Sequence, residues 1–329
     1  MPRDYQTSSG ALNKARALQY CWEDFVNLIH DSEWIVHLDE ETLLTEESVK
    51  GILNFITDGR RPIGQGMITY AHDPPNFKSP WNTFQNRICT VADSFRVTED
   101  LGKIRGQFLL LHKAIFGMKG SYVVTQAKVE KHISFDNGLA GSIAEDAYFA
   151  IKAIDLGYTF GFIEGEMREK SPFSFSDFIK QRRRWMQGIY LVATDGARLT
   201  FKSRFWIGVS VWAWILVPFA TSNVILGKIY PIRLWIIPDI MVHFTGAMAL
   251  YLYFFGFVMQ HNIRRFSILR LIFVIPEVIF ASIVSIVCEH IAVFTMWFGN
   301  WYDFYIVQKE VDFEGSSDTK KMATDLNIV

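Results

Sequence analysis

The chain has 329 residues, of which 50% are hydrophobic, and its formal net charge is -1. This length is sufficient for one soluble domain and an additional membrane part. The balanced charge gives no overall field that would attract nucleic acid, so we expect no nucleic-acid partner. The three cysteines are far apart and match neither a disulfide framework nor a zinc-binding spacing, which favours a reducing compartment.

Residues 1–205 alternate between helical and strand patterns, which predicts a soluble α/β domain. The predicted helices are residues 13–29, 48–55 and 145–156, and the predicted strands are residues 34–38, 62–70 and 123–125. The first strand is a short apolar run that ends in acids, as expected of a buried strand in a parallel sheet.

Residues 206–299 contain three long apolar segments, at 206–226, 232–259 and 267–298. Each is long enough to cross a hydrocarbon core of roughly 30 Å, which takes about 20 helical residues. Aromatic residues near their ends favour a membrane over three buried helices of a soluble protein, the alternative interpretation. Pro276 interrupts the third segment, which we interpret as a kinked span or as a short interfacial piece followed by a span.

Basic residues flank the apolar segments and orient the chain. They are Lys202, Arg204, Arg264, Arg265 and Arg270. Because cytosolic loops are enriched in such residues, we expect these loops and residues 1–205 in the cytosol. Residues 300–329 form a polar tail without that basic bias, and we expect them on the lumenal side.

The first cluster with chemical potential is Asp39-Glu40-Glu41. Asp39 follows a predicted strand, so its carboxylate is expected at the carboxyl edge of the sheet, where open α/β folds bind ligands. Asp39 and Glu41 are suited to share Mg²⁺ or Mn²⁺ with substrate phosphates, and such a cation would neutralise a departing diphosphate. The alternative is that these acids form a helix N-terminus with Thr42 and Thr45 as capping residues.

The second cluster, Glu145-Asp146, begins a predicted helix after the glycine-rich loop 136–141. A carboxylate here is a candidate general base, accepting the proton of a sugar hydroxyl that displaces a diphosphate. Such a single displacement inverts the anomeric centre. The alternative is ordinary, because acids in a first helical turn favour the helix dipole.

The third cluster, Gln181 to Trp185, lies in a helical stretch just before the apolar segments. Arg184 can contact a diphosphate through its planar guanidinium group, and Trp185 can offer an apolar face to an acceptor sugar. The alternative is a basic amphipathic helix that lies on anionic lipid headgroups.

The order Asp-x-acid, Glu-Asp, Gln-x-x-Arg-Trp and then membrane helices resembles the family 2 inverting glycosyltransferases. These enzymes have a GT-A fold and include cellulose, chitin and hyaluronan synthases. Longer runs are more specific and resemble the egghead-type β-1,4-mannosyltransferases. These runs are residues 9–12, 14–21, 34–45, 92–97, 119–126 and 160–167.

The resemblance implies transfer of mannose from GDP-mannose to glucosylceramide, in glycosphingolipid biosynthesis, with Mg²⁺ or Mn²⁺. It implies a multi-pass protein of the endoplasmic reticulum or Golgi membrane. The roles that it assigns are metal and diphosphate ligands for Asp39 and Glu41, catalytic base for Asp146, positioning partner for Glu145, and a donor-binding closing motif for Gln181, Arg184 and Trp185.

Two features of the membrane half bear on the acceptor. Three spans suit a lipid-linked acceptor better than a polymer-conducting channel. Glu277, Glu289 and His290 lie within the third apolar segment, and they should face protein or water because charge is costly in lipid. They are expected to help receive the lipid headgroup, or else to lie near the interface or pair with one another.

The chain also departs from the family pattern. Only 38 residues precede Asp39, whereas one βαβ unit needs roughly 30 or more. We therefore expect a partial, Rossmann-like GT-A domain with a mostly parallel sheet, lacking the first nucleotide-holding strands and exposing a strand edge. Two alternatives to mannose transfer remain open: another family 2 activity, such as transfer from UDP-glucose to ceramide, or a catalytically inactive membrane-binding protein.

Overall fold

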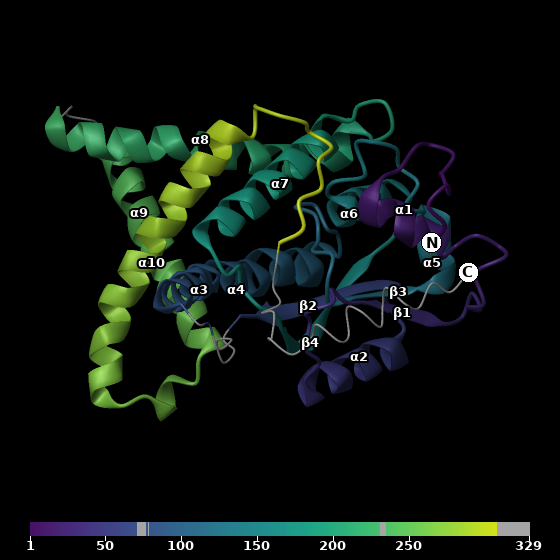
Figure 1. Cartoon of the computed structure of the whole chain (residues 1–329), viewed down its shortest axis with the longest axis horizontal. Helices are drawn as coiled ribbons and strands as arrows, with labels where there is room; N and C mark the ends of the chain where they lie inside the picture. The colour runs from purple at the N-terminus through teal and green to yellow at the C-terminus, as the bar shows by residue number, and fades with distance from the viewer. Residues whose placement is uncertain (71–76, 78, 231–234, 308–329) are drawn as a thin grey trace.

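A four-stranded mixed sheet organises the first two thirds of the chain in the computed structural model, which describes residues 1–70, 77, 79–230 and 235–307 (Figure 1). The strands are β1 (Trp34–His37), β2 (Ile63–Thr69), β3 (Val123–Gln126) and β4 (Phe160–Arg168), in the order β1-β3-β2-β4. β2 and β4 are parallel, and β3 is antiparallel to both β1 and β2. Therefore β1, β2 and β4 point the same way, and their carboxyl ends lie at one edge of the sheet.

The three predicted strands are confirmed, but the expectation of a mostly parallel sheet is wrong. Because β3 runs in the opposite direction between β1 and β2, two of the three pairings are antiparallel. β1 is also not a buried parallel strand. It lies at the edge of the described sheet, and Val36 is 36% exposed.

Helices cover both faces of the sheet. In the α/β part they are α1 (Asn13–Tyr20), α2 (Glu46–Asp58), α3 (Pro80–Ala92), α4 (Ser94–Glu99), α5 (Ala127–Ile133), α6 (Glu145–Asp155) and α7 (Phe175–Thr194), with two π-helical turns, η1 (Asp100–Ile104) and η2 (Gln107–Leu111). α2 begins two residues before the predicted start at residue 48, because the Thr45 and Ser48 side chains form a reciprocal capping box.

The predicted helix over 13–29 is shorter than expected. α1 ends at Tyr20, and a turn from the Gln19 carbonyl to the Trp22 amide follows. This turn carries the Trp22 indole into the core, where its Nε1 donates to Glu130 Oε1 at 3.2 Å. Burial of this large side chain favours the early end over the continuation of the helical pattern.

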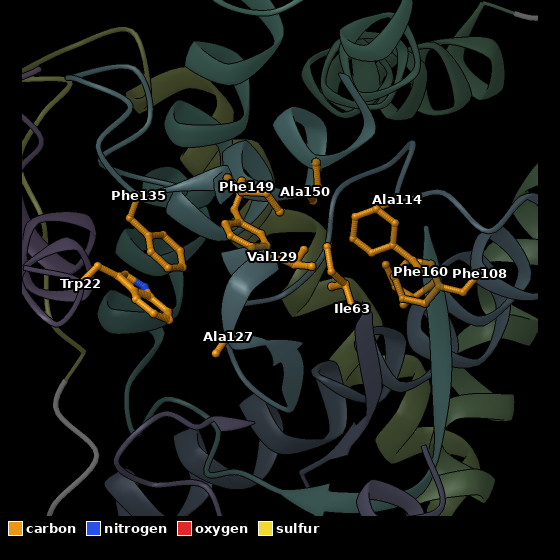
Figure 2. Packing of buried hydrophobic residues seen from close by; sticks show 13 residues of the cluster. Trp22, Ile63, Phe108, Ala114, Ala127, Val129, Phe135, Phe149, Ala150 and Phe160 are labelled. Carbon is orange, nitrogen blue, oxygen red and sulfur yellow. The ribbon is translucent and has the colours of Figure 1, made fainter. Parts of the chain in front are cut away.

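Two groups of buried residues hold the layers together. On one face, Ile63 and Phe160 of the sheet pack with Trp22, Phe135 and Phe149 (Figure 2). On the other face, α2 contributes to a cluster whose buried members are Ile52, Ile68, Tyr70, Val97, Tyr122, Val124, Ile163 and Met167. The alternation of side chains along β4 supplies both groups.

Three long apolar helices follow: α8 (Phe201–Ile229), α9 (Ile236–Gln260) and α10 (Ile268–Thr295), with the short 3₁₀ helix η3 (Ile263–Arg265) before α10. All three are long and apolar enough to cross a membrane, as predicted. Pro276 lies inside α10, which is one continuous helix rather than two pieces. Figure 1 shows α9 and α10 on the side of the molecule away from α1.

The ionisable residues of α10 face protein partners, as expected. Glu277 accepts hydrogen bonds from Arg87, at 2.5 Å from its Nε, and from Arg270. Glu289 accepts from Trp214 Nε1 on α8 at 3.1 Å and lies 3.9 Å from Arg182 Nε on α7. The hydrogen bonds and ion pairs of both glutamates among the described residues are thus made with Arg87, Arg270, Trp214 and Arg182.

Candidate active site

The candidate site lies at the edge of the sheet where β1, β2 and β4 end. Asp39 comes two residues after β1, Tyr70 directly after β2, and Glu169 directly after β4. Ser121, just before β3, reaches the same edge and accepts a hydrogen bond from the Asp39 amide at 3.2 Å. The mixed topology therefore still gathers polar groups at the carboxyl ends of three parallel strands, where α/β folds bind ligands.

Three carboxylates meet at this edge. One oxygen from each of Asp39, Glu41 and Glu169 lies within 4.8 Å of the others. Glu169 is only 3% exposed, and Thr42 Oγ1 donates to its Oε1 at 3.1 Å. Since all the ligand atoms are hard carboxylate oxygens, the group fits Mg²⁺ or Mn²⁺ and lacks the nitrogen or sulfur ligands typical of zinc.

The structure thus brings Asp39 and Glu41 together but separates them from the helix start. α2 begins at Glu46 and is capped by Thr45, so Asp39 and Glu41 precede the helix. The capping interpretation is right for Thr45 and wrong for Thr42, whose hydroxyl contacts Ser121 and Glu169.

Glu169 is a site residue that the sequence reasoning missed. An acid directly after a strand was the signal that identified Asp39, and the same signal holds for Glu169. Recognising this signal at Glu169 requires a predicted strand over residues 160–168. No strand is predicted there, because two glycines and two glutamates interrupt the apolar pattern.

Asp146 is the second component and lies with Glu145 in the first turn of α6. Burial of the Asp146 carboxyl, and then the neighbouring Glu145 carboxylate, raises its pKa to about 7. The Ala147 amide, which donates to Asp146 Oδ1 at 2.7 Å, and the Lys14 ammonium partly oppose this shift. A carboxyl whose pKa lies near neutral pH is suited to act as a general base.

Lys14 of α1 connects the two acidic groups. Its Nζ lies 2.7 Å from Asp39 Oδ1 and 3.5 Å from Glu145 Oε1. Burial opposes the charge of this ammonium, but Glu145 and Asp39 outweigh burial and raise the pKa of Lys14. Lys14 lies within the run 14–21 that resembles the β-1,4-mannosyltransferases, but the sequence alone assigns it no role.

Gly120 allows this close approach. A Cβ atom at this position would lie 3.2 Å from both Lys14 Nζ and Asp146 Oδ2, so a larger side chain would enter the space between them. A small cavity of about 20 Å³ opens beside these groups and is also lined by His37 and Glu145.

The third component comes from α7. The carboxylates of Glu145, Asp146, Asp39 and Glu41 all act on the Arg184 guanidinium, so it lies within electrostatic reach of both acidic clusters. Burial is the larger influence and lowers the pKa of Arg184. Its guanidinium carbon lies 4.3 Å from the Phe304 ring centre, and its Nε has no hydrogen-bond partner among the described residues. Because Phe304 and Tyr305 contact α7 of the α/β part, the expectation that the α/β part and residues 300–329 lie on opposite sides of the membrane is wrong for the described start of this tail.

The other two residues of the closing motif lie against protein as well. Gln181 is buried, and its Oε1 accepts from Arg182 Nη1 at 3.3 Å. Trp185 is partly buried and is contacted by the guanidinium groups of Arg96 and Arg182. Arg182 and Arg184 thus face protein groups rather than lipid headgroups, whereas Arg183 donates to the Phe298 carbonyl at an exposed position, where headgroup contact stays a prediction.

Three features thus lie close to one sheet edge: a carboxylate group suited to a divalent cation, the partly buried acid Asp146, and the guanidinium of Arg184. The helices beside them are apolar enough for a membrane. The model of the family described as "Glycosyl transferase family group 2" matches residues 34–259. The chain therefore belongs to this glycosyltransferase family.

Two relatives extend the similarity along most of the chain. It is 48% identical over 311 residues to "Beta-1,4-mannosyltransferase egh" of Drosophila melanogaster, and 45% identical over 313 residues to "Beta-1,4-mannosyltransferase bre-3" of Caenorhabditis elegans. Each match covers 94% of this chain, and the chain spans 66% of the length of each relative. The resemblance to β-1,4-mannosyltransferases is confirmed.

Proposed function

We propose that this chain carries the catalytic site of an inverting glycosyltransferase that moves mannose from GDP-mannose to glucosylceramide, giving Manβ1,4Glc-ceramide. The observation that supports it most is the meeting of Asp146, the carboxylate group and Arg184 at one sheet edge. The relatives, which are named as β-1,4-mannosyltransferases, support the sugar and the linkage.

In this proposal Asp146 accepts the proton of the acceptor's 4-hydroxyl as that oxygen attacks the anomeric carbon of mannose. The bond from this carbon to the diphosphate oxygen breaks on the opposite face, and GDP leaves with the bonding electrons. One displacement inverts the anomeric centre and needs no nucleophile from the protein. The pKa of Asp146, about 7, leaves a substantial fraction of the carboxyl ionised at neutral pH.

The leaving diphosphate carries the charge that the remaining groups would stabilise. Asp39, Glu41 and Glu169 would hold Mg²⁺ or Mn²⁺, which would neutralise negative charge on the diphosphate. Arg184 has an unpartnered donor and a planar guanidinium suited to two phosphate oxygens. Lys14 holds Asp39 and Glu145 in place, at 2.7 Å and 3.5 Å from its Nζ.

The acceptor is proposed to remain in a bilayer while its sugar reaches the site. α7, which carries Arg184 and Trp185, packs directly against α8 and α10, so the catalytic edge is close to helices that are apolar enough to cross a membrane. This neighbourhood favours a lipid-linked acceptor in an endoplasmic reticulum or Golgi membrane, with the α/β part in the cytosol.

Donor and acceptor exchange tests the proposal. The purified chain in lipid nanodiscs would be given GDP-mannose or UDP-glucose, each with glucosylceramide or ceramide, in the presence of Mn²⁺. We expect mannosylated glucosylceramide as the main product. A clear preference for UDP-glucose with ceramide would contradict the proposed substrates, and no product together with no GDP binding would contradict catalysis by this chain.

A further inference from the structure

Trp185 lies in a stack of alternating rings and guanidinium groups. The guanidinium carbon of Arg96 lies 4.5 Å from the Trp185 ring centre and 4.4 Å from the Tyr70 ring centre. That of Arg182 lies 4.5 Å from the Trp185 ring centre and 4.2 Å from the Phe178 ring centre. The contacts therefore follow the order Tyr70, Arg96, Trp185, Arg182, Phe178.

The stack is assembled from three parts of the fold. Phe178, Arg182 and Trp185 follow the spacing i, i+4 and i+7 on α7, so they lie along one face of this helix. Arg96 comes from α4, and Tyr70 directly follows β2 at the edge of the sheet that carries the candidate site. The Arg96 guanidinium, which contacts both rings, thus connects the indole of Trp185 to Tyr70 at that edge of the sheet.

One carboxylate joins the two arginines. Asp93 lies between α3 and α4 and is fully buried. Its Oδ1 accepts from Arg182 Nη2 at 2.5 Å and lies 3.8 Å from Arg96 Nη1. Its Oδ2 accepts from Ser171 Oγ at 2.7 Å, which holds the carboxylate in its orientation.

This carboxylate is what makes the stack electrostatically favourable. Two guanidinium groups on one indole repel each other, and both are almost removed from water, with side chains 12% and 4% exposed. Asp93 contacts both arginines and supplies the opposite charge, whereas Glu289 approaches Arg182, at 3.9 Å, and Glu169 and Asp100 act on Arg96 from further along the site. Removing the charge of Asp93 would remove the carboxylate that contacts both cations, and the arginines would then shift relative to Trp185.

We propose that Asp93 is a positioning residue that fixes the Trp185 indole at the candidate site, acting through Arg96 and Arg182, which both contact the ring. The proposal rests on the proposed function and on the interpretation of the sequence in which Trp185 contacts the acceptor sugar. Asp93 itself touches neither donor nor acceptor, because its side chain is enclosed by Arg182, Arg96 and Ser171.

The first test follows the indole directly and needs no activity. The chain has 10 tryptophans, so the full-length protein would be labelled with 5-fluorotryptophan and its ¹⁹F spectrum recorded in detergent micelles. Trp185→Phe identifies the Trp185 resonance. We expect Asp93→Asn to shift or broaden that resonance and to leave the resonance of Trp22, which belongs to the other core, unchanged.

Two further variants make this test decisive. Arg96→Met removes one guanidinium but keeps the Asp93–Arg182 pair, so it should disturb the Trp185 resonance even if Asp93→Asn does not fold. Asp155→Asn is the matched control, because this carboxylate instead binds Thr200 and Ser203 at the start of α8. A Trp185 resonance that stays unchanged in both Asp93→Asn and Arg96→Met would overturn the proposal.

The second test asks whether the indole serves the acceptor. Asp93→Asn should raise the KM for glucosylceramide by about tenfold, because small displacements of a binding group are costly, and change the KM for GDP-mannose by less than about twofold. If Asp93 acts through Trp185, adding Asp93→Asn to Trp185→Leu should cause no further loss. Additive losses would refute this route of action.

The two tests separate the two hypotheses. If the wild-type chain transfers no mannose to glucosylceramide, the proposed function fails, and the ¹⁹F result alone decides whether Asp93 positions the indole. If transfer occurs and the Trp185 resonance does not respond, the positioning role fails while the proposed function stands.

Discussion

Replacing the two charged neighbours of Asp146 should move the pH dependence of sugar transfer in opposite directions. The Glu145 carboxylate raises the pKa of Asp146, and the Lys14 ammonium lowers it. A general base works when deprotonated, so activity falls as pH drops below the pKa of Asp146. Glu145→Gln should therefore shift the acidic limb of the pH–rate profile to lower pH, and Lys14→Met should shift it to higher pH.

The size of the Lys14 effect follows from geometry. Lys14 Nζ and Asp146 Oδ2 each lie 3.2 Å from the same point beside Gly120, so they are close neighbours. Two unit charges about 6 Å apart at an effective dielectric constant of about 20 interact by about 2.8 kcal/mol, or about two pKa units. Because Lys14 is partly exposed and also pairs with Asp39 and Glu145, we expect about half of this, roughly one pH unit.

The assay is kcat/KM for mannose transfer between pH 5 and pH 9 at saturating Mn²⁺, because this ratio reports the ionisation of the free enzyme. Wild type should show an acidic limb set by Asp146, and the two variants should move its midpoint in opposite directions. Lys50→Met is the matched control, since Lys50 pairs with Glu46 and Glu47 on the surface of α2, and it should leave the midpoint unchanged. Shifts of the same sign in Glu145→Gln and Lys14→Met would refute the reasoning.

Three further predictions concern the other components. Glu169→Gln removes one of three clustered carboxylates. The dissociation constant for Mn²⁺, measured by calorimetry in the presence of GDP, should rise by about tenfold or more. An unchanged dissociation constant would exclude Glu169 as a ligand. Arg184→Lys keeps the charge but loses the planar contact, so the KM for GDP-mannose should rise about tenfold while that for glucosylceramide stays the same. Asp146→Asn should raise the Tm at pH 8, and raise it less at pH 5. The pKa of Asp146 is about 7 in the folded state and 3.8 ordinarily. Ionisation of Asp146 therefore destabilises the wild-type fold as pH rises, and the variant cannot ionise at this position. A wild-type Tm that matches or exceeds that of the variant at pH 8 would contradict this.

Local patterns were sufficient for several elements of the structure. The acid after a strand placed Asp39 at the edge of the sheet, and the capping signal of Thr45 marked the start of α2. Length and apolar composition were enough for α8, α9 and α10. In each case the deciding interaction lies within a few residues of the signal.

Other features depend on contacts between distant residues, which local patterns do not report. The direction of β1 is set by β3, which follows about 90 residues later in the chain, and a short apolar run looks the same in either pairing. Asp93 lies at the junction between two helices in a largely apolar run, and its proposed role follows from pairing with Arg182, 89 residues away. The early end of α1 likewise depends on the distant Glu130, which binds the Trp22 indole.

The most direct test of the account is the stereochemistry and base dependence of a single reaction. GDP-mannose and glucosylceramide would be incubated with the wild-type chain and with Asp146→Asn, both in nanodiscs and with Mn²⁺, and the anomeric configuration of the product determined by NMR. The account predicts a β-linked mannose from the wild type and loss of transfer by Asp146→Asn, with GDP binding retained. An α-linked product, or transfer by Asp146→Asn at the wild-type rate, would contradict it.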